Sequence, residues 1–276
     1  MIVDNSALEA VLAGLAEVGR KVVIPGFTGR ADLGIRAKAD EYDLVTDADE
    51  AAEELLSRAL EKVFPGGVVV GEEGVAADPA VLSGLAGAEI GILIDPIDGT
   101  WNFANGVPIF GMMVAITHFG RTIAGAIHYP LTGDFIYGRA DKGAFYRAHD
   151  GAEAPLRVAA ARSVEDMSGF VAQPLFPKPE QLDLARRSAR FQRTTNFRCS
   201  AYEYRLIAQG SLHFSLNAGL KPWDHAAGVL IHQLAGGHAG LLGGQDYHPG
   251  RAEGYLLLGP DPESWQTLRE VFTGQG

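Results

Sequence analysis

The stretch IGILIDPIDGT, residues 90–100, joins a short apolar run to closely spaced acids. The apolar part, residues 90–94, is too short for a helix and rich in β-branched residues, which predicts a buried strand. A similar run at residues 68–70 also leads into acids, at Gly71-Glu72-Glu73. Carboxylates at the ends of neighbouring buried strands are poorly placed for packing and well placed for a site. The two runs predict an α/β fold with functional residues at its strand ends.

Helical patterns lie before these strands. Apolar residues from Ser6 to Val22 recur at three- and four-residue steps, and Pro25-Gly26 is expected to end that helix. Thr46, followed three residues later by Asp49, is typical of a helix N-cap, and the second helix is expected to stop at Pro65.

The rest of the chain mixes strands and helices. Regularly spaced glycines between residues 111 and 151 predict an antiparallel meander, and Pro155 offers a hinge. Beyond it we expect a helix at 202–209, a strand at 212–216 and a helix at 223–234. We therefore expect one domain over residues 1–276, with an N-terminal lobe of about 1–155 and a C-terminal lobe of about 156–276.

Composition and charge narrow the classes of function. With 276 residues, 47% of them hydrophobic and 21% charged, the chain has the composition of a globular enzyme. A net charge of −11 argues against a nucleic-acid partner, because binding to the phosphate backbone needs clusters of Lys and Arg. The N-terminus lacks the apolar core of a signal peptide, and no apolar run approaches membrane-spanning length. We expect a cytoplasmic protein without a membrane partner, in which the single cysteine, Cys199, is a buried thiol.

Four acids, Glu72, Asp95, Asp98 and Asp224, stand in or beside predicted strand ends or helix starts. Two like charges about 4 Å apart repel by roughly 4 kcal/mol at an effective dielectric constant near 20. A cluster of this kind must be protonated, spread apart or filled by cations. Hard oxygen ligands favour Mg²⁺, so we expect a magnesium site.

Asp98-Gly99-Thr100 adds a second element to the expected site. Glycine lets the backbone approach an anion, and successive N–H groups at a helix start can receive phosphate oxygens. Pro96 stiffens the turn between Asp95 and Asp98, whose carboxylates can then face neighbouring metal ions. Ions so spaced would bind both the attacking water and the leaving oxygen of a phosphate ester.

The order and spacing of these segments resemble the motifs of the inositol monophosphatase family over nearly the whole chain. The matching segments are Asp43-Leu44-Val45-Thr46-Asp47-Ala48-Asp49, Gly71-Glu72-Glu73, Asp95-Pro96-Ile97-Asp98-Gly99-Thr100-Trp101-Asn102-Phe103 and Trp223-Asp224-His225-Ala226-Ala227-Gly228. The resemblance implies a five-layer αβαβα sandwich, shared with fructose-1,6-bisphosphatase, and a homodimer. It also implies Mg²⁺-dependent, lithium-sensitive phosphatase activity.

The resemblance further implies a role for each matching residue. A first Mg²⁺ would bind Glu72, Asp95 and the Ile97 carbonyl, and a second would bind Asp95, Asp98 and Asp224, while Glu72 would share in a third, weaker ion. The implied catalytic residues are Glu72 together with Asp49 and Thr100, the pair that orients and activates the metal-bound water. The implied substrate-binding residues are Asp98, Gly99, Thr100, Lys38, Ser200 and Asn217.

Two positions bear on the substrate. Asn217 aligns where inositol phosphatases place a glutamate that binds the sugar ring, and an amide donates and accepts hydrogen bonds differently from a carboxylate. Ser200 aligns with another position of the substrate wall. His225, beside Asp224, is expected to pack in the interior, because the helix phase turns it away from its neighbour.

The function that we expect is hydrolysis of a small phosphorylated metabolite by direct attack of a metal-activated water. Inositol monophosphate is the first candidate substrate, and histidinol phosphate or other sugar and nucleotide phosphates are alternatives. The haloacid dehalogenase phosphatases offer a rival mechanism with an aspartate nucleophile, but their Asp-x-Asp-Gly-Thr motif has one residue fewer between its acids than Asp95 and Asp98 have. A third reading is a regulatory protein that contacts the transcription machinery, as some bacterial relatives of the family do.

Overall fold

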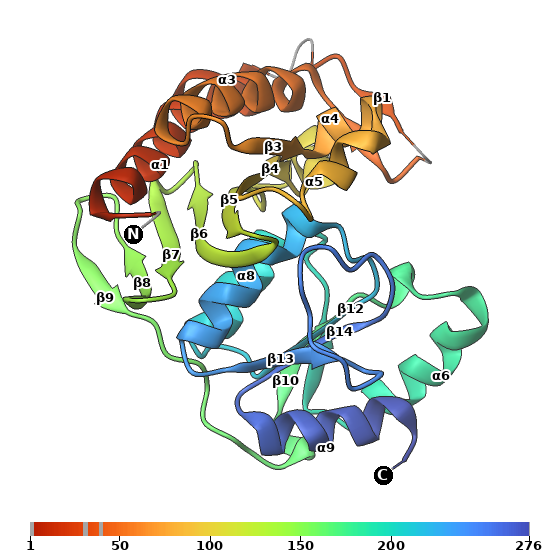
Figure 1. The fold of residues 1–276 in the computed structure, drawn as a ribbon. Coiled ribbons are helices and arrows are strands. Elements are labelled where there is room, and N and C mark those ends of the chain that lie inside the picture. Colours follow the sequence, from red (N-terminus) through yellow and green to blue (C-terminus); the bar gives the residue numbers. More distant parts are fainter. Residues whose placement is uncertain (1–2, 30–32, 39–40, 276) are drawn as a thin grey trace.

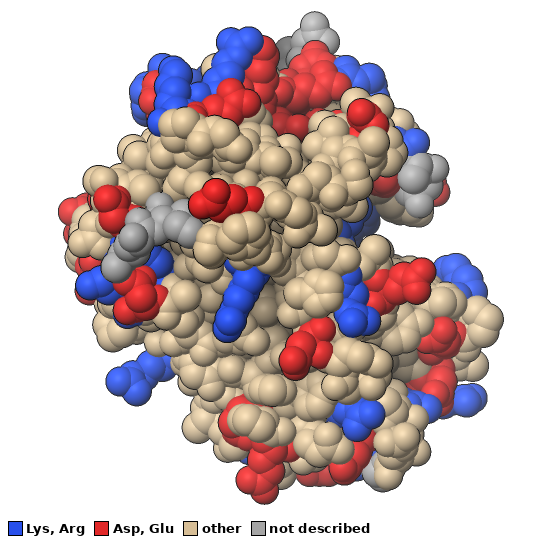
Figure 2. All heavy atoms as spheres, in the orientation of Figure 1, with Lys and Arg blue, Asp and Glu red and all other residues tan. Residues whose placement is uncertain are grey.

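Two large sheets alternate with three layers of helices in the computed structural model, which describes residues 3–29, 33–38 and 41–275 (Figure 1). This αβαβα arrangement confirms the predicted fold class. No helix of the described ranges is long and apolar enough to cross a lipid bilayer. On the face shown in Figure 2, basic side chains stand among acidic ones.

The first sheet has seven strands in sequence order. They are β3 (Val68–Gly71), β4 (Ile90–Asp98), β5 (Gly111–His118), β6 (Arg121–Tyr129), β7 (Asp134–Arg139), β8 (Gly143–Arg147) and β9 (Glu153–Pro155). β3 runs parallel to β4, and each later pair is antiparallel, which confirms the predicted meander. The strand predicted at residues 90–94 continues through the acidic segment to Asp98. Its ladder with β5 shifts register between Asp95 and Asp98.

Helices α1 (Asn5–Val18) and α3 (Asp47–Val63) cover the outer face of this sheet (Figure 1). Their apolar faces meet alternate residues of β4 in one core, with Leu15, Leu56 and Ile92 fully buried. Asp49 accepts the backbone N–H of Thr46 in a capping box, which confirms the predicted start of α3.

The first helix does not stop at Pro25, contrary to the prediction. It passes through a π-helical turn, Gly19–Val23, into α2 (Ile24–Gly29), and the N–H of Ile24 bonds to the carbonyl of Gly19. Proline lacks the N–H that an α-helical ladder needs, and a wider turn shifts the ladder just before it. The helical path therefore continues past Pro25.

The second sheet has the strand order β11-β10-β12-β14-β13. Its strands are β10 (Ser168–Val171), β11 (Arg193–Thr195), β12 (Phe214–Asn217), β13 (His238–Leu241) and β14 (Leu256–Gly259). Helices α7 (Ser200–Ala208) and α8 (Pro222–Leu234) lie between the sheets, and α6 (Lys178–Ser188) and α9 (Pro262–Thr273) cover the outer face (Figure 1). The helices predicted at 202–209 and 223–234 are thus present within two residues at each end.

Short elements complete the described part of the chain. They are β1 (Arg36–Ala37), β2 (Leu44–Val45), α4 (Glu72–Ala77), α5 (Thr100–Asn105) and the 3₁₀ turns Pro79–Gly84, Val164–Asp166 and Gln173–Leu175. The chain passes from the first sheet to the second between β9 and β10. The division into lobes near residue 155 stays a prediction.

Candidate active site

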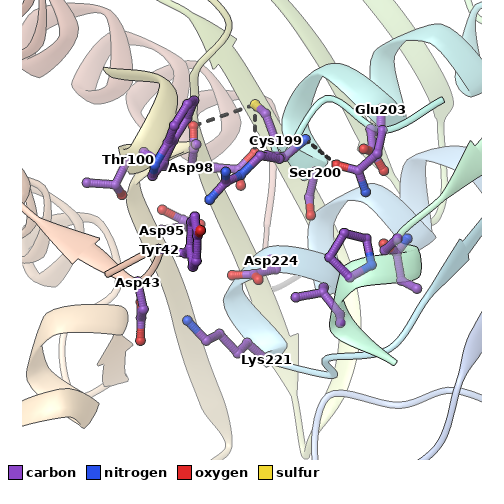
Figure 3. Close-up of a pocket in the computed structure, with 18 of the residues that line it drawn as sticks. Tyr42, Asp43, Asp95, Asp98, Thr100, Cys199, Ser200, Glu203, Lys221 and Asp224 are labelled. Atoms are coloured by element: carbon purple, nitrogen blue, oxygen red, sulfur yellow. Dashed lines mark hydrogen bonds between the residues drawn. The ribbon is translucent and has the colours of Figure 1, made fainter. Parts of the chain in front are cut away.

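A cavity of about 620 Å³ is lined by most of the residues that the sequence singles out (Figure 3). Lys38 and Asp49 do not line it, but they contact Glu72 and Thr100, which do. Glu72 enters from the start of α4, Asp95 and Asp98 from the end of β4, and Asp224 from the first turn of α8. Ser200 of α7 and Asn217 of β12 also line the cavity. Segments far apart in the sequence therefore meet at one place between the two sheets.

Glu72, Asp95 and Asp224 form an acidic trio whose ligand oxygens lie within 4.8 Å of one another. Asp95 is 1% exposed, and its Oδ1 atom has no hydrogen-bond partner in the described part of the chain. Burial, and then the charges of Glu72, Asp98 and Asp224, raise the pKa of Asp95 well above its ordinary value. A divalent cation would relieve both the repulsion and the unsatisfied oxygen, and carboxylate oxygens suit Mg²⁺. The trio therefore fits a metal ion.

Asp98 lies in the same cavity but outside the acidic trio. Its Oδ2 atom accepts the N–H of Ala201 at 2.5 Å and the thiol of Cys199 at 3.1 Å. Burial raises the pKa of Asp98 to about 6, although these hydrogen bonds oppose the shift. The position of Cys199 confirms a buried thiol and ties α7 to the acidic segment of β4.

Asp49 and Thr100 are in contact, as the resemblance implies. Thr100 Oγ1 lies 3.1 Å from Asp49 Oδ1 and 2.9 Å from the carbonyl oxygen of Ile97. Burial raises the pKa of Asp49 to about 7, which is well suited to proton transfer near neutral pH. The geometry places the two residues together, and their catalytic roles stay predictions.

Two lysines meet Glu72. The Nζ atoms of Lys38 and Lys221 each lie 3.1 Å from Glu72 Oε1, and Lys38 also lies 2.6 Å from Glu73 Oε1. Burial favours the neutral acid, but the two ammonium groups outweigh it and hold the pKa of Glu72 below its ordinary value. Sequence reasoning expected Lys38 here but did not place Lys221 beside Glu72; the one signal of Lys221 is its position just before the helix that carries Asp224.

Gly99 shapes the segment expected to hold phosphate. Its φ of 88° lies in the left-handed region, and α5 begins at the next residue, Thr100. A Cβ atom at Gly99 would come within 2.9 Å of the carbonyl oxygen of Ile109. Only glycine meets both conditions without strain.

The substrate wall contains expected and unexpected residues. Asn217 is 6% exposed and donates from Nδ2 to Ser215 Oγ at 2.9 Å. Sequence reasoning missed Glu203, and also Arg198, whose guanidinium carbon lies 4.1 Å from the ring centre of Trp101. Neither residue belongs to a motif, so only the folded cavity reveals them.

His225 packs in the interior, as predicted. Its Nε2 atom lies 2.7 Å from the carbonyl oxygen of Gly219, and its Nδ1 atom lies 2.9 Å from the hydroxyl of Tyr204. The carbonyl must accept from Nε2–H, so Nδ1 accepts from the tyrosine. Burial lowers the pKa of His225 to about 4, and the neutral ring fixes the loop that leads to α8.

The layered fold, the acidic cavity and the family match together place the chain among the phosphoric monoester hydrolases. The chain belongs to the inositol monophosphatase family, whose sequence pattern matches residues 4–267. The resemblance seen in the sequence is thereby confirmed.

Similar proteins carry several names. An inositol-1-monophosphatase of Caulobacter vibrioides is 30% identical over 240 residues, which cover 84% of this chain and 90% of the relative. A histidinol-phosphatase of Chlorobaculum parvum is 31% identical over 225 residues, or 81% of each chain. A Nus factor SuhB of Vibrio cholerae is 31% identical over 215 residues, or 74% of each chain.

Solved structures agree on the fold. The extragenic suppressor protein suhB of Bartonella henselae superposes with a TM-score of 0.83 at 24% identity, covering 97% of this chain and 98% of that one. The Thermotoga maritima IMPase superposes with a TM-score of 0.79 at 23% identity, covering 98% of this chain and 100% of that one.

Proposed function

We propose that the chain is a Mg²⁺-dependent phosphomonoesterase that hydrolyses a small phosphorylated metabolite, with inositol monophosphate as the first candidate. The observation that carries the proposal is the acidic trio, with its unsatisfied Asp95 oxygen inside a cavity large enough for a small phosphate ester. Family membership supports the phosphatase class.

Glu72, Asp95, Asp98, Asp224 and the Ile97 carbonyl would hold two to three Mg²⁺ ions, whose bound charge would neutralise the phosphate and lower the pKa of water. Asp49 would accept a proton from the attacking water, and the Thr100 hydroxyl, beside Asp49 Oδ1, would orient that water. The backbone N–H groups of Gly99 and Thr100 would bind phosphate oxygens. Lys38 and Lys221 would add positive charge beside Glu72.

The proposal needs no covalent enzyme intermediate. Asp95, the residue that an aspartyl-phosphate mechanism would use, lies among other carboxylates, which favour a cation over a phosphoryl group. Trapping of a phospho-aspartate on Asp95 by mass spectrometry would support the rival mechanism instead.

Phosphate release from a panel of esters tests the function. The panel contains myo-inositol 1-phosphate, histidinol phosphate, fructose 1,6-bisphosphate and a nucleoside 3′-phosphate, each with Mg²⁺ and with EDTA. We expect Mg²⁺-dependent release from at least one ester, with inositol phosphate the best. Histidinol phosphate is the alternative, because a similar protein bears the name histidinol-phosphatase and Asn217 departs from the inositol pattern. Release from none of the four refutes the proposal.

A regulatory role is the second candidate, because several similar proteins are named Nus factor SuhB. Affinity purification of the tagged chain from its source cells, followed by mass spectrometry, tests whether transcription proteins accompany it.

A cytoplasmic location, a homodimer and lithium inhibition complete the proposal. Cell fractionation, analytical ultracentrifugation and assays with LiCl test them in turn.

A further inference from the structure

Glu203 is a buried acid that none of the roles above uses. It lies on α7, three residues after Ser200, and lines the cavity with 4% of its surface exposed. Figure 3 shows it on the same side as Ser200 and away from Asp43 and Thr100. Glutamates are almost never so buried without a partner.

The Glu203 carboxyl group has one partner among the described residues. Its Oε1 atom accepts the backbone N–H of Phe197 at 3.0 Å, and no described cation pairs with it. Burial raises the pKa of Glu203 to about 8; the Phe197 N–H opposes this shift, and the charge of Asp98 adds to it. The carboxyl group is therefore mainly uncharged at neutral pH, and its O–H is a hydrogen-bond donor.

Glu203 lines the cavity together with other neutral polar groups. Ser200 begins α7, and Asn217 ends β12 with its Nδ2 atom bonded to Ser215. A hydroxyl group can accept a hydrogen bond from a neutral carboxyl group and donate one to an amide oxygen. Few but well-placed polar groups of this kind determine the orientation and specificity of a small ligand.

We propose that Glu203 is a specificity-determining residue that hydrogen-bonds a hydroxyl group on the alcohol portion of the substrate. This inference rests on the proposed phosphomonoesterase function and adds to it the residue that distinguishes hydroxylated from plain alcohols.

A pair of esters with the same ring tests the proposal. myo-Inositol 1-phosphate and cyclohexyl phosphate differ only in the ring hydroxyls, and kcat/KM is measured for both with Mg²⁺. The wild-type chain is expected to prefer the inositol ester by more than about tenfold, since sites that bind a hydroxyl reject analogues without it. Glu203→Ala is expected to lower this ratio at least about tenfold, because the donor is gone.

Glu203→Gln should keep the ratio within about threefold of wild type, because its amide can donate into the cavity and still accept the Phe197 N–H. Ile207→Val is the matched control on the same helix, where Ile207 is 1% exposed and does not line the cavity. A packing defect would lower kcat/KM for both esters together and would leave their ratio unchanged.

Several results would overturn the inference. They are an unchanged ratio in Glu203→Ala, a loss in Glu203→Gln as large as in Glu203→Ala, and a wild-type ratio near one, which needs no variant to fold. Preference for 2-aminocyclohexyl phosphate over the inositol ester would show that Glu203 is a charged carboxylate that binds an ammonium group. Release of phosphate from histidinol phosphate, but from neither myo-inositol 1-phosphate nor cyclohexyl phosphate, would overturn the role of Glu203 in binding a hydroxyl and leave the proposed phosphomonoesterase function standing. Release from no ester at all would also refute the proposed function.

Discussion

Asp95 is the residue on which the metal site most depends, because its oxygens meet both Glu72 and Asp224. Asp95→Asn keeps the shape and removes one charge of the cluster. We expect calorimetry with phosphate present to show no Mg²⁺ uptake, and kcat/KM to fall by at least about a thousandfold, since two ions would lose a shared ligand. The exposed Glu165→Gln is the control and should behave as wild type. Normal Mg²⁺ uptake in Asp95→Asn would exclude the proposed ligand set.

Thr100 offers a second test at the scale of one hydroxyl group. Thr100→Val keeps nearly the same volume but removes the contact to Asp49 and the bond to the Ile97 carbonyl. We expect kcat to fall about a hundredfold with little change in KM, a typical contribution of acid–base groups. Thr100→Ser restores the hydroxyl and should recover most of the rate. Equal rates for the valine and serine variants in steady-state assays would contradict a role of the Thr100 hydroxyl in orienting the attacking water.

The sequence predicts the acidic residues of the site better than its cationic residues and the other residues that line the cavity. Asp95 and Asp98 lie in one uncommon motif, and carboxylates beside buried strands have no packing role. Lys221 and Arg198 could equally be surface cations in a sequence, because long charged side chains are usually exposed. Only the fold shows Lys221 on Glu72 and Arg198 on Trp101.

At the scale of elements, periodicity locates helices and strands but not their irregularities. The apolar pattern finds α1 and α3, yet it does not show the π turn at Gly19–Val23 that carries the chain past Pro25. The register shift within β4 is similarly absent from the pattern. Both depend on hydrogen bonds between particular backbone groups, whereas periodicity records only which side chains are buried.

The close contact between α8 and β6 positions Asp224, and glycine makes it possible. A Cβ atom at Gly125 would lie 2.8 Å from the Cα atom of Ala227, a backbone atom that cannot rotate away. Gly125→Ala should lower the free energy of unfolding by about 1–3 kcal/mol, a typical cost of overpacking. The shifted helix should also weaken Mg²⁺ binding.

Gly87→Ala is the matched control, because nothing lies within 4 Å of its added Cβ atom. It should change stability by less than about 0.5 kcal/mol, as surface substitutions usually do. Urea unfolding and Mg²⁺ calorimetry of both variants check the prediction. Equal stability of the two alanine variants would show that α8 can move away from β6 without cost.

At the scale of the whole molecule, the five layers follow from the family resemblance and not from local patterns. Apolar alternation places Ile92 and Leu93 on opposite faces of β4, but it does not say which helices cover each face. That choice depends on contacts between distant segments, such as α8 against β6. The order of the motifs along the chain supplies this information, because it identifies a known arrangement.

The metal-free protein should lose stability as the pH rises from about 6.5 to 8.5. Burial raises the pKa of Asp49 to about 7 and of Glu203 to about 8, so both hold protons in the folded state that the unfolded chain has already released. Stability from such groups is complete at low pH and is lost as the pH rises through the folded pKa. His128, His225 and His232, with pKa values lowered to about 4, act in the opposite direction only below about pH 6.5.

Asp49 and Glu203 by themselves are expected to lower the free energy of unfolding by roughly 3 kcal/mol over this range, since each unit of pKa shift corresponds to about 1.4 kcal/mol. Urea titrations in EDTA at several pH values measure it directly. Glu203→Gln is neutral at every pH, so its stability should fall less steeply with pH than that of the wild-type chain. A stability that rises between pH 6.5 and 8.5, or an equal slope in wild type and Glu203→Gln, would show that these carboxyl groups ionise normally in the folded chain, and the neutral form of Glu203 would then be wrong as well.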